Sequence, residues 1–236
     1  MANPVRWLGI HTQPVHKTDA ALSALGGFLG ILIVLLVTRM VLGETAAVII
    51  IPSMGASAVL LFAAPHAPFS QPWNLMGGHA LSALVGVACW QWIPQPDLAA
   101  AASVGLATGL MYLARCIHPP GGATALAAVI GSENVHALGY GYEFQPVLIN
   151  TITILLAAIL FNALWRWRRY PAAWSASPGS PPTADAEQKR GYPDIRHEDF
   201  VYALSELSTL ADVSEEDLVR IYRLATQYRQ TKRACR

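Results

Sequence analysis

The fold of this chain is decided by the stretch His118-Pro119-Pro120-Gly121-Gly122-Ala123-Thr124, which ends one long apolar segment and opens another. Proline removes a backbone donor and its ring clashes with the preceding turn, so a helix that reaches this stretch must stop. A new helix can start on the small residues behind the prolines. The apolar sequence from 118 to 131 is only 14 residues long, whereas a straight crossing needs about 20. The stretch therefore predicts a broken or re-entrant segment inside a membrane.

The charges divide the chain into two unlike parts. Between Ala20 and Trp165 there are 6 charged residues in 146, whereas the 71 residues from Arg166 onward carry 22. Soluble domains carry roughly 25% charged residues. The first part therefore has a lipid bilayer as its surroundings and the second has water. The formal net charge of +1 favours no nucleic-acid partner, and the basic residues after the last apolar segment are interpreted as topology signals.

The apolar pattern predicts an all-α, polytopic membrane helix bundle. Each full span needs about 20 apolar residues, and four stretches qualify. A fifth apolar stretch, 45–64, contains Pro52 and Gly55 in its middle, so a kink or an unwound turn is expected there. The four expected full spans are 21–42, 73–93, 98–117 and 147–165.

Four regions follow from this pattern. We expect an N-terminal lead at 1–19, a membrane domain at 20–169 and a flexible linker rich in Pro, Ser and Ala at 170–192. A small cytoplasmic helical hairpin is expected at 193–236, because apolar residues recur there with helical spacing and Ser214 precedes three acidic residues, which is a typical helix start.

The membrane domain contains an internal repeat. Pro52-x-x-Gly55-Ala56-Ser57-Ala58 matches Pro119-x-x-Gly122-Ala123-Thr124-Ala125, and Gln71-Pro72 matches Gln145-Pro146 further along. Two units are predicted, at about 21–93 and 97–166, each made of a helix, a broken segment and a helix. Six crossings with an inverted second unit, or four crossings with two re-entrant segments, both place the two termini on the cytoplasmic side. Interrupted segments in corresponding halves are typical of a transporter's binding site.

The repeated motif predicts a transporter or channel for a small inorganic anion, which would bind at the N-termini of the two broken helices. Where a helix restarts, its first N–H groups are unpaired and carry a partial positive charge, and Ser57 and Thr124 add hydroxyl groups. Arg39 and Arg115 could supply a full charge, although small residues also pack helices closely and an arginine near a helix end can snorkel to the interface. The candidate substrate-binding residues are Gly55, Ala56, Ser57, His118, Gly121, Gly122, Ala123, Thr124, Arg115, Arg39 and His79.

No cofactor, metal or catalytic residue is expected. The three cysteines lie far apart without ligand spacing, and the absence of a carboxylate inside the expected spans argues against a cation relay. Two other functions stay open. One is a membrane-embedded sensor or scaffold that signals through the C-terminal helices. The other is a rhomboid-like intramembrane serine protease with Ser57 as nucleophile and His79 or His118 as base, although Ala58 stands where such a motif has glycine.

With these motifs identified, the chain resembles the HPP family of integral membrane proteins. The resemblance rests on 118–126, on 52–62 and on Gln71-Pro72-Trp73-Asn74 with Gly78-His79, and it covers about 21–165. It implies four spanning helices and transport, and nitrite transport is associated with plastid and cyanobacterial members. This chain departs from the family at Gly121, where alanine is common, and in its terminal hairpin, where some relatives carry a CBS pair. The expected partners are a small anion, the bilayer and a second copy in a homodimer or small homo-oligomer, in a bacterial plasma (inner) membrane.

Overall fold

A computed structural model covers the chain and describes residues 16–174 and Tyr222. Most of the expected lead, most of the linker and, apart from Tyr222, the predicted hairpin at 193–236 lie outside the described residues. From 16 to 174 the chain forms helices and short connections, with no strand among the described residues. The predicted all-α membrane fold is confirmed.

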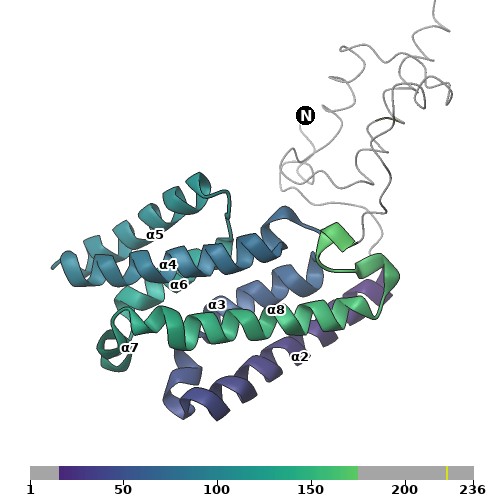
Figure 1. The fold of residues 1–236 in the computed structure, drawn as a ribbon, viewed down its shortest axis with the longest axis horizontal. Coiled ribbons are helices and arrows are strands. Elements are labelled where there is room, and N and C mark those ends of the chain that lie inside the picture. Colours follow the sequence, from purple (N-terminus) through teal and green to yellow (C-terminus); the bar gives the residue numbers. More distant parts are fainter. Residues whose placement is uncertain (1–15, 175–221, 223–236) are drawn as a thin grey trace, which may run out of the picture. The chain divides into compact units, whose positions relative to one another are not determined.

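Seven α-helices are described, and the long ones lie roughly along one common direction (Figure 1). Short turns of 3₁₀ or π helix connect or extend them at Pro68–Ser70 (η1), Glu143–Val147 (η2), Arg166–Arg168 (η3) and Ala172–Trp174 (η4). The α-helices are α2 (Lys17–Leu42), α3 (Glu44–Ala63), α4 (Pro72–Trp92), α5 (Pro96–Leu113), α6 (Pro119–Ile130), α7 (Glu133–Leu138) and α8 (Leu148–Ala163).

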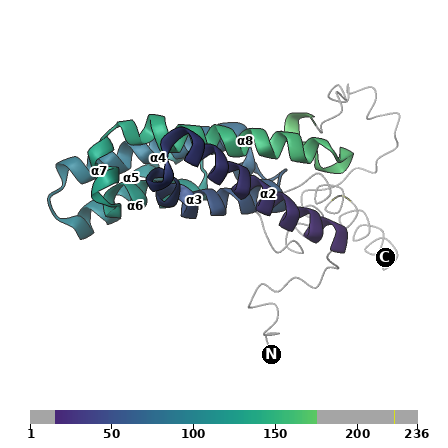
Figure 2. The same ribbon diagram turned by 90° about the horizontal axis from the view of Figure 1, so that it is seen from below.

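Helix α2 packs against α3 and α8 through a stripe of residues four apart in sequence (Figure 2). The aromatic ring of Phe62 lies against Gly26 and Gly30, where an added Cβ atom would come within 2.5 Å and 2.4 Å of it. Phe62 also makes an edge contact with Phe161, at 5.5 Å between ring centroids. Gly26 and Gly30 therefore leave the space on α2 in which the Phe62 ring packs. The buried stripe comprises Gly26, Gly30, Val34 and Thr38.

The unwound turn expected at Pro52 and Gly55 is absent, because α3 continues as one helix from Glu44 to Ala63, while the kink stays a prediction. A proline deletes only one N–H donor from the helical ladder, and membrane helices tolerate it where neighbouring groups satisfy the backbone. A Cβ atom added at Gly55 would meet nothing within 4 Å, so packing does not require that glycine.

The second predicted break is present between α5 and α6. Helix α5 ends at Leu113, Arg115 has a φ of 54°, and His118 is extended before α6 begins at Pro119. The exposed carbonyls of this connection are satisfied by α4: the Trp73 indole donates to Ala114 O at 3.2 Å and the Asn74 amide donates to Ile117 O at 2.8 Å. With 12 residues, α6 is about 18 Å long, which is too short to cross a bilayer.

Three described helical segments are long and apolar enough to cross a membrane: Lys17–Leu42, Pro96–Leu113 and Glu143–Ala163. Helix α4 has 21 residues but is more polar, and its polar side chains His79 and Ser82 are buried against neighbouring helices. Its ends carry Trp73 and Trp92, which are 62% and 77% exposed. They stand about 28 Å apart along the helix, close to the hydrocarbon thickness, and indoles prefer the two interfaces. Helix α4 thus has the length and the ends of a span.

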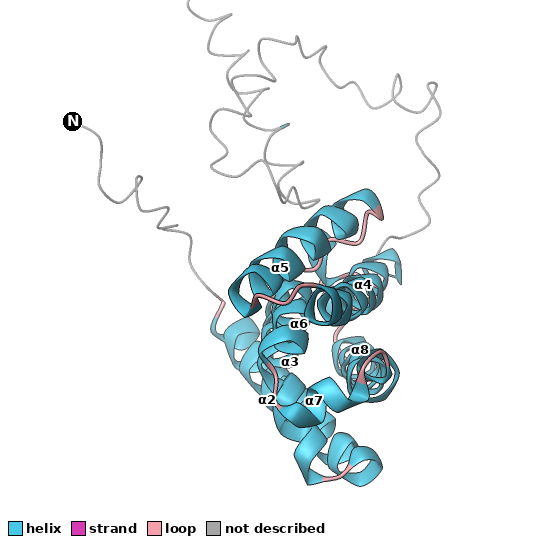
Figure 3. Ribbon diagram, turned by 90° about the vertical axis from the view of Figure 1, so that its left-hand side faces the viewer, coloured by secondary structure: helices cyan, strands magenta, loops and turns pink. Residues whose placement is uncertain are grey.

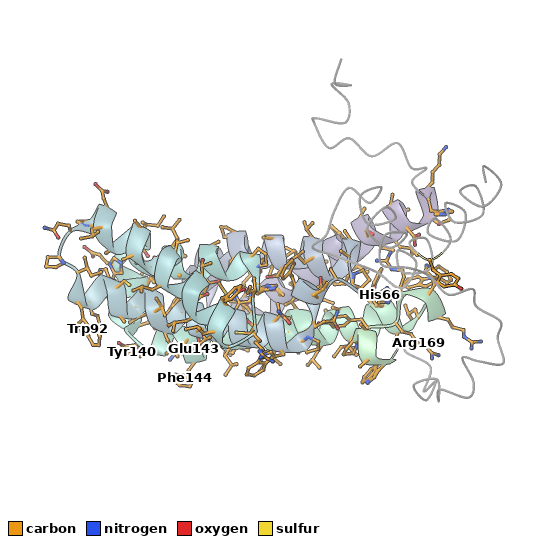
Figure 4. The ribbon with its side chains drawn as sticks, turned by 90° about the horizontal axis from the view of Figure 1, so that it is seen from above. His66, Trp92, Tyr140, Glu143, Phe144 and Arg169 are labelled. Atoms are coloured by element: carbon orange, nitrogen blue, oxygen red, sulfur yellow. The ribbon has the colours of Figure 1, made fainter. Side chains whose placement is uncertain are left out.

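One end of the bundle is fastened by the segment after α8. Arg168, interpreted from sequence as part of a topology signal, is only 5% exposed. Its guanidinium donates to the carbonyl of Phe62 and forms an ion pair with Asp19 at 3.5 Å. His66 and Arg169 lie at this end, opposite Trp92 and Tyr140 (Figure 4). The loop after α3 and the end of α8 are therefore held together by Arg168, whose positive charge sits beside the last carbonyls of α3.

Candidate functional site

Four polar side chains meet in the interior of the helix bundle. They come from α3, α4 and the start of α6, and both α3 and α4 pack against α6 (Figure 3 shows these three helices). Ser57 comes from α3, His79 from α4, His118 from the residue before α6 and Thr124 from α6. Each has a relative exposure of 0%. We refer to these four residues as the histidine cluster.

Short contacts join all four residues of the histidine cluster. The Ser57 hydroxyl oxygen lies 2.9 Å from Nε2 of His79 and 2.9 Å from Nε2 of His118. The other ring nitrogen of His79, Nδ1, is 2.7 Å from Thr124 Oγ1, and Nδ1 of His118 is 2.9 Å from the Phe69 carbonyl. The two rings meet edge to face at 4.9 Å between centroids. Every ring nitrogen therefore has a partner.

Glycines on α4 and α6 bring these side chains together. A Cβ atom at Gly78 would come within 2.4 Å of the His118 Cβ, and one at Gly86 within 2.5 Å of the Ala125 carbonyl oxygen. From the other side, a Cβ atom at Gly121 would come within 2.9 Å of the Gly78 carbonyl. Larger residues would separate the two helices, so the Gly78 and Gly86 positions set the distance between His79 and the start of α6.

The expected cradle of free backbone N–H groups is absent from both motifs. Pro119 and Pro120 open α6 without any N–H, and the N–H of Gly121 donates to the His118 carbonyl at 2.8 Å. In α3 the motif lies inside a continuous helix, so its N–H groups belong to the helical ladder. Donors for a ligand must come from side chains.

The structure brings only some of the predicted site residues together. Ser57, His79, His118 and Thr124 form the histidine cluster, and Gly121 is buried at its edge against α4. Arg39, in the last turn of α2, and Arg115 are exposed, and neither is a hydrogen-bond partner of the cluster. The binding role of every predicted site residue, inside or outside the cluster, stays a prediction. Four more predicted residues lie outside the cluster. Of these, Gly55 and Gly122 are partly exposed, and Ala56 and Ala123 are exposed.

Sequence reasoning missed a second buried polar group, on the α8 segment. Glu143 is 6% exposed and lies in the π turn that opens the apolar segment Glu143–Ala163 (Figure 4). A carboxyl group therefore does lie inside a span, contrary to the expectation. Its Oε2 atom and the Nδ2 atom of Asn150 are buried without a hydrogen-bond partner among the described residues, while Asn150 Oδ1 accepts from Thr38. Pro146 was the sequence signal that could have placed Glu143 in the helical segment. The first turn of a helix tolerates proline, so this segment can begin before Pro146.

The site offers no cage for a metal ion. Within the described ranges, no group of three or more His, Cys, Asp and Glu side chains is placed to hold one. The Phe69 carbonyl, which orients His118, is a backbone group and left no signal in the sequence.

Comparison with known proteins gives the family. Two transmembrane proteins of Dictyostelium discoideum are similar to the chain: one is 39% identical over 175 residues, 72% of this chain and 56% of the relative. The other is 38% identical over 154 residues, 64% of this chain and 54% of the relative. The chain thus matches just over half of the length of each relative. No solved structure matches it. The HPP transmembrane region matches residues 12–171, and this chain therefore belongs to the HPP transmembrane family.

Proposed function

We propose that this protein transports a small inorganic anion, nitrite or a close analogue, across a membrane. The observation that carries the proposal is the histidine cluster, because two imidazoles and two hydroxyls are fully buried beside the start of a half-length helix. Ionisable groups within a membrane domain are costly and usually mark a solute pathway. Short or interrupted helices are typical of transporter sites.

The chemistry of the histidine cluster favours a small polar solute. Its hydroxyl and imidazole groups are polar, and among the described residues no carboxylate or guanidinium is bonded to any of its members. We place the protein in a bacterial plasma membrane with both termini in the cytoplasm. The Arg166, Arg168 and Arg169 run directly after the last span supports the cytoplasmic side for the C-terminal end of that span.

Uptake by vesicles containing the purified full chain tests the proposal. We expect saturable nitrite uptake that exceeds that of protein-free vesicles, because nitrous acid itself crosses lipid and sets the background. Ser57→Ala removes a hydroxyl that contacts both imidazoles, and should lower uptake about tenfold, the effect of roughly 1.4 kcal/mol for a lost buried hydrogen bond.

Ser103→Ala is the matched control. Ser103 is equally buried, but its hydroxyl bonds the Ala100 carbonyl on its own helix, outside the histidine cluster. Uptake by this variant should stay within about twofold of the unsubstituted chain. Wild-type vesicles that take up neither nitrite nor nitrate above background would refute the transport proposal.

A serine hydrolase is the second candidate, because Ser57 Oγ lies within 2.9 Å of an imidazole nitrogen. A nucleophile bonded to a histidine is the expected arrangement for such an enzyme. The backbone weighs against it: Ser57 lies within a continuous helix, so the N–H groups around it are not available to stabilise an oxyanion.

Reaction with a fluorophosphonate probe separates the two candidates. We expect no labelling of the full chain in vesicles, since Ser57 is fully buried and lacks an oxyanion site. Labelling that disappears in Ser57→Ala would instead establish an activated serine and favour the hydrolase.

A further inference from the structure

The hydrogen bonds of the histidine cluster run in one direction when both rings are neutral. The Phe69 carbonyl only accepts, so His118 carries its proton on Nδ1 and presents a bare Nε2. Ser57 then donates to His118 Nε2, and the Ser57 oxygen accepts from Nε2 of His79. His79 is left with a bare Nδ1, which accepts from the Thr124 hydroxyl. The order Thr124, His79, Ser57, His118, Phe69 is a continuous chain from donor to acceptor.

A neutral histidine cluster has nothing to offer an anion. Every N–H and O–H in it is already used by a neighbour within the chain just described. The start of α6 adds no free backbone N–H, because of Pro119, Pro120 and the bonded Gly121. An anion removed from water requires a compensating charge or donors. Positive charge must therefore enter the cluster along with the anion.

This row of hydrogen bonds can take up one proton without moving any heavy atom. Thr124 Oγ1 accepts an incoming proton as it passes its own to His79 Nδ1. His79 releases its Nε2 proton to Ser57, which passes its own hydroxyl proton to His118 Nε2. The cluster then holds one additional proton, as a positive charge on His118, and no other bond has formed or broken. The Ser57 hydroxyl can then rotate back to its original direction, because the Ser53 carbonyl, 3.1 Å away, accepts its proton during the rotation.

A charged His118 attracts an anion because of where it lies. It is the residue directly before α6, where the helix dipole adds further positive potential. A buried cation without a counter-charge is costly inside a membrane, and an anion beside it removes that cost. The proton and the anion are therefore most stable in the site as a neutral pair.

The other titratable groups around the two rings are few. Along α4 the Cys116 side chain contacts Gly77, and the Tyr142 hydroxyl donates to the Thr124 carbonyl at 3.4 Å. Glu143 follows Tyr142 but makes no hydrogen bond to the histidine cluster. Among the described residues, the hydrogen-bond partners of the two rings are Ser57 on α3, Thr124 on α6 and the Phe69 carbonyl in η1.

We propose that Thr124, His79, Ser57 and His118 form a proton relay, and that each anion crosses together with one proton held on His118. This inference rests on the proposed transport function and specifies its coupling. The protein would then be an electroneutral proton–anion symporter rather than an anion channel.

The coupling is tested with nitrite in vesicles that contain the full chain and a pH-sensitive dye. We expect uptake to follow an inward proton gradient, to collapse with a protonophore, and to carry one proton per nitrite above the protein-free background. A potassium diffusion potential should leave the initial rate within about twofold. Uptake that follows the potential and ignores the proton gradient would overturn the relay but leave transport intact; no uptake under any condition would overturn both.

Two variants locate the proton. Thr124→Val keeps the side-chain shape but removes the hydroxyl that starts the relay, and should lower proton-driven uptake about tenfold; Thr124→Ser should recover most of it. Glu143→Gln neutralises the other buried acid and should change the rate by less than about twofold. If Glu143→Gln abolishes proton-driven uptake while Thr124→Val does not, the proton travels through Glu143 and the relay is refuted.

Discussion

Replacing His118 with glutamine is expected to lower nitrite uptake about 100-fold. The imidazole of His118 connects the Phe69 carbonyl to Ser57 at 2.9 Å on each side. A glutamine amide can reach one partner or the other, and it cannot hold a proton at physiological pH. Loss of one buried hydrogen bond at about 1.4 kcal/mol corresponds to about one order of magnitude, and loss of the group that holds the proton is expected to contribute the other. The measurement is the initial rate of proton-driven uptake into vesicles.

The matched control for His118→Gln is His136→Gln. His136 also bonds a backbone carbonyl, that of Val129 at 3.1 Å, and it stacks on Trp90 at 4.2 Å. It lies on α7, outside the histidine cluster, so the same substitution should lower stability without changing uptake by more than about twofold. Equal losses in both variants would mean that His118 acts through folding alone.

Replacing Gly86 with valine is expected to lower the free energy of unfolding by about 3 kcal/mol. An added Cβ atom would come within 2.5 Å of the Ala125 carbonyl oxygen, 2.8 Å of the Ala128 Cβ and 3.0 Å of the Ala125 Cα. Two of these contacts are backbone atoms of α6, which cannot turn aside as a side chain can. Helices α4 and α6 must therefore separate, which would also disturb the contact between His79 and Thr124. Thermal unfolding in detergent measures the change.

Gly109→Val makes the same substitution where there is space. Gly109 is exposed on α5, and an added Cβ atom would meet nothing within 4 Å. Its stability should change by no more than about 0.5 kcal/mol. Equal destabilisation by the two substitutions would show that valine in these helices is the cause, rather than the close approach of α4 and α6.

The predicted fold agrees with the structure where local chemistry is sufficient. The two prolines after His118 start α6 and keep the preceding helix from running into it, because proline lacks an N–H and its ring excludes the preceding turn. Helix α5 ends at Leu113, four residues before the predicted end of that span. Pro52 carries the same chemistry but α3 passes through it. A single missing donor is a small defect, and whether it breaks a helix depends on what the neighbouring helices supply.

For the candidate site, too, the sequence predicted which residues take part but not how they pair. The repeat identified Ser57 and Thr124, and their residue types identified His79 and His118, so all four members of the histidine cluster were named from sequence. Their pairing was not, because residues 22 to 61 positions apart meet only when α3, α4 and α6 pack. The arginines attracted attention by charge alone, and both lie exposed outside the cluster. Glu143 was expected to lie outside the spans, because the last span was predicted to start four residues later, at 147.

The sequence by itself determined that this chain lies in a membrane, is helical and starts a new helix directly after His118. Those properties follow from hydrophobicity and proline chemistry, which act within a few neighbouring residues. Only the tertiary structure decided that the motif offers buried imidazoles and hydroxyls rather than free backbone amides. The reason is the close approach of α4 to the start of α6 at Gly78 and Gly86, together with the hydrogen bond that the Gly121 N–H donates to the His118 carbonyl.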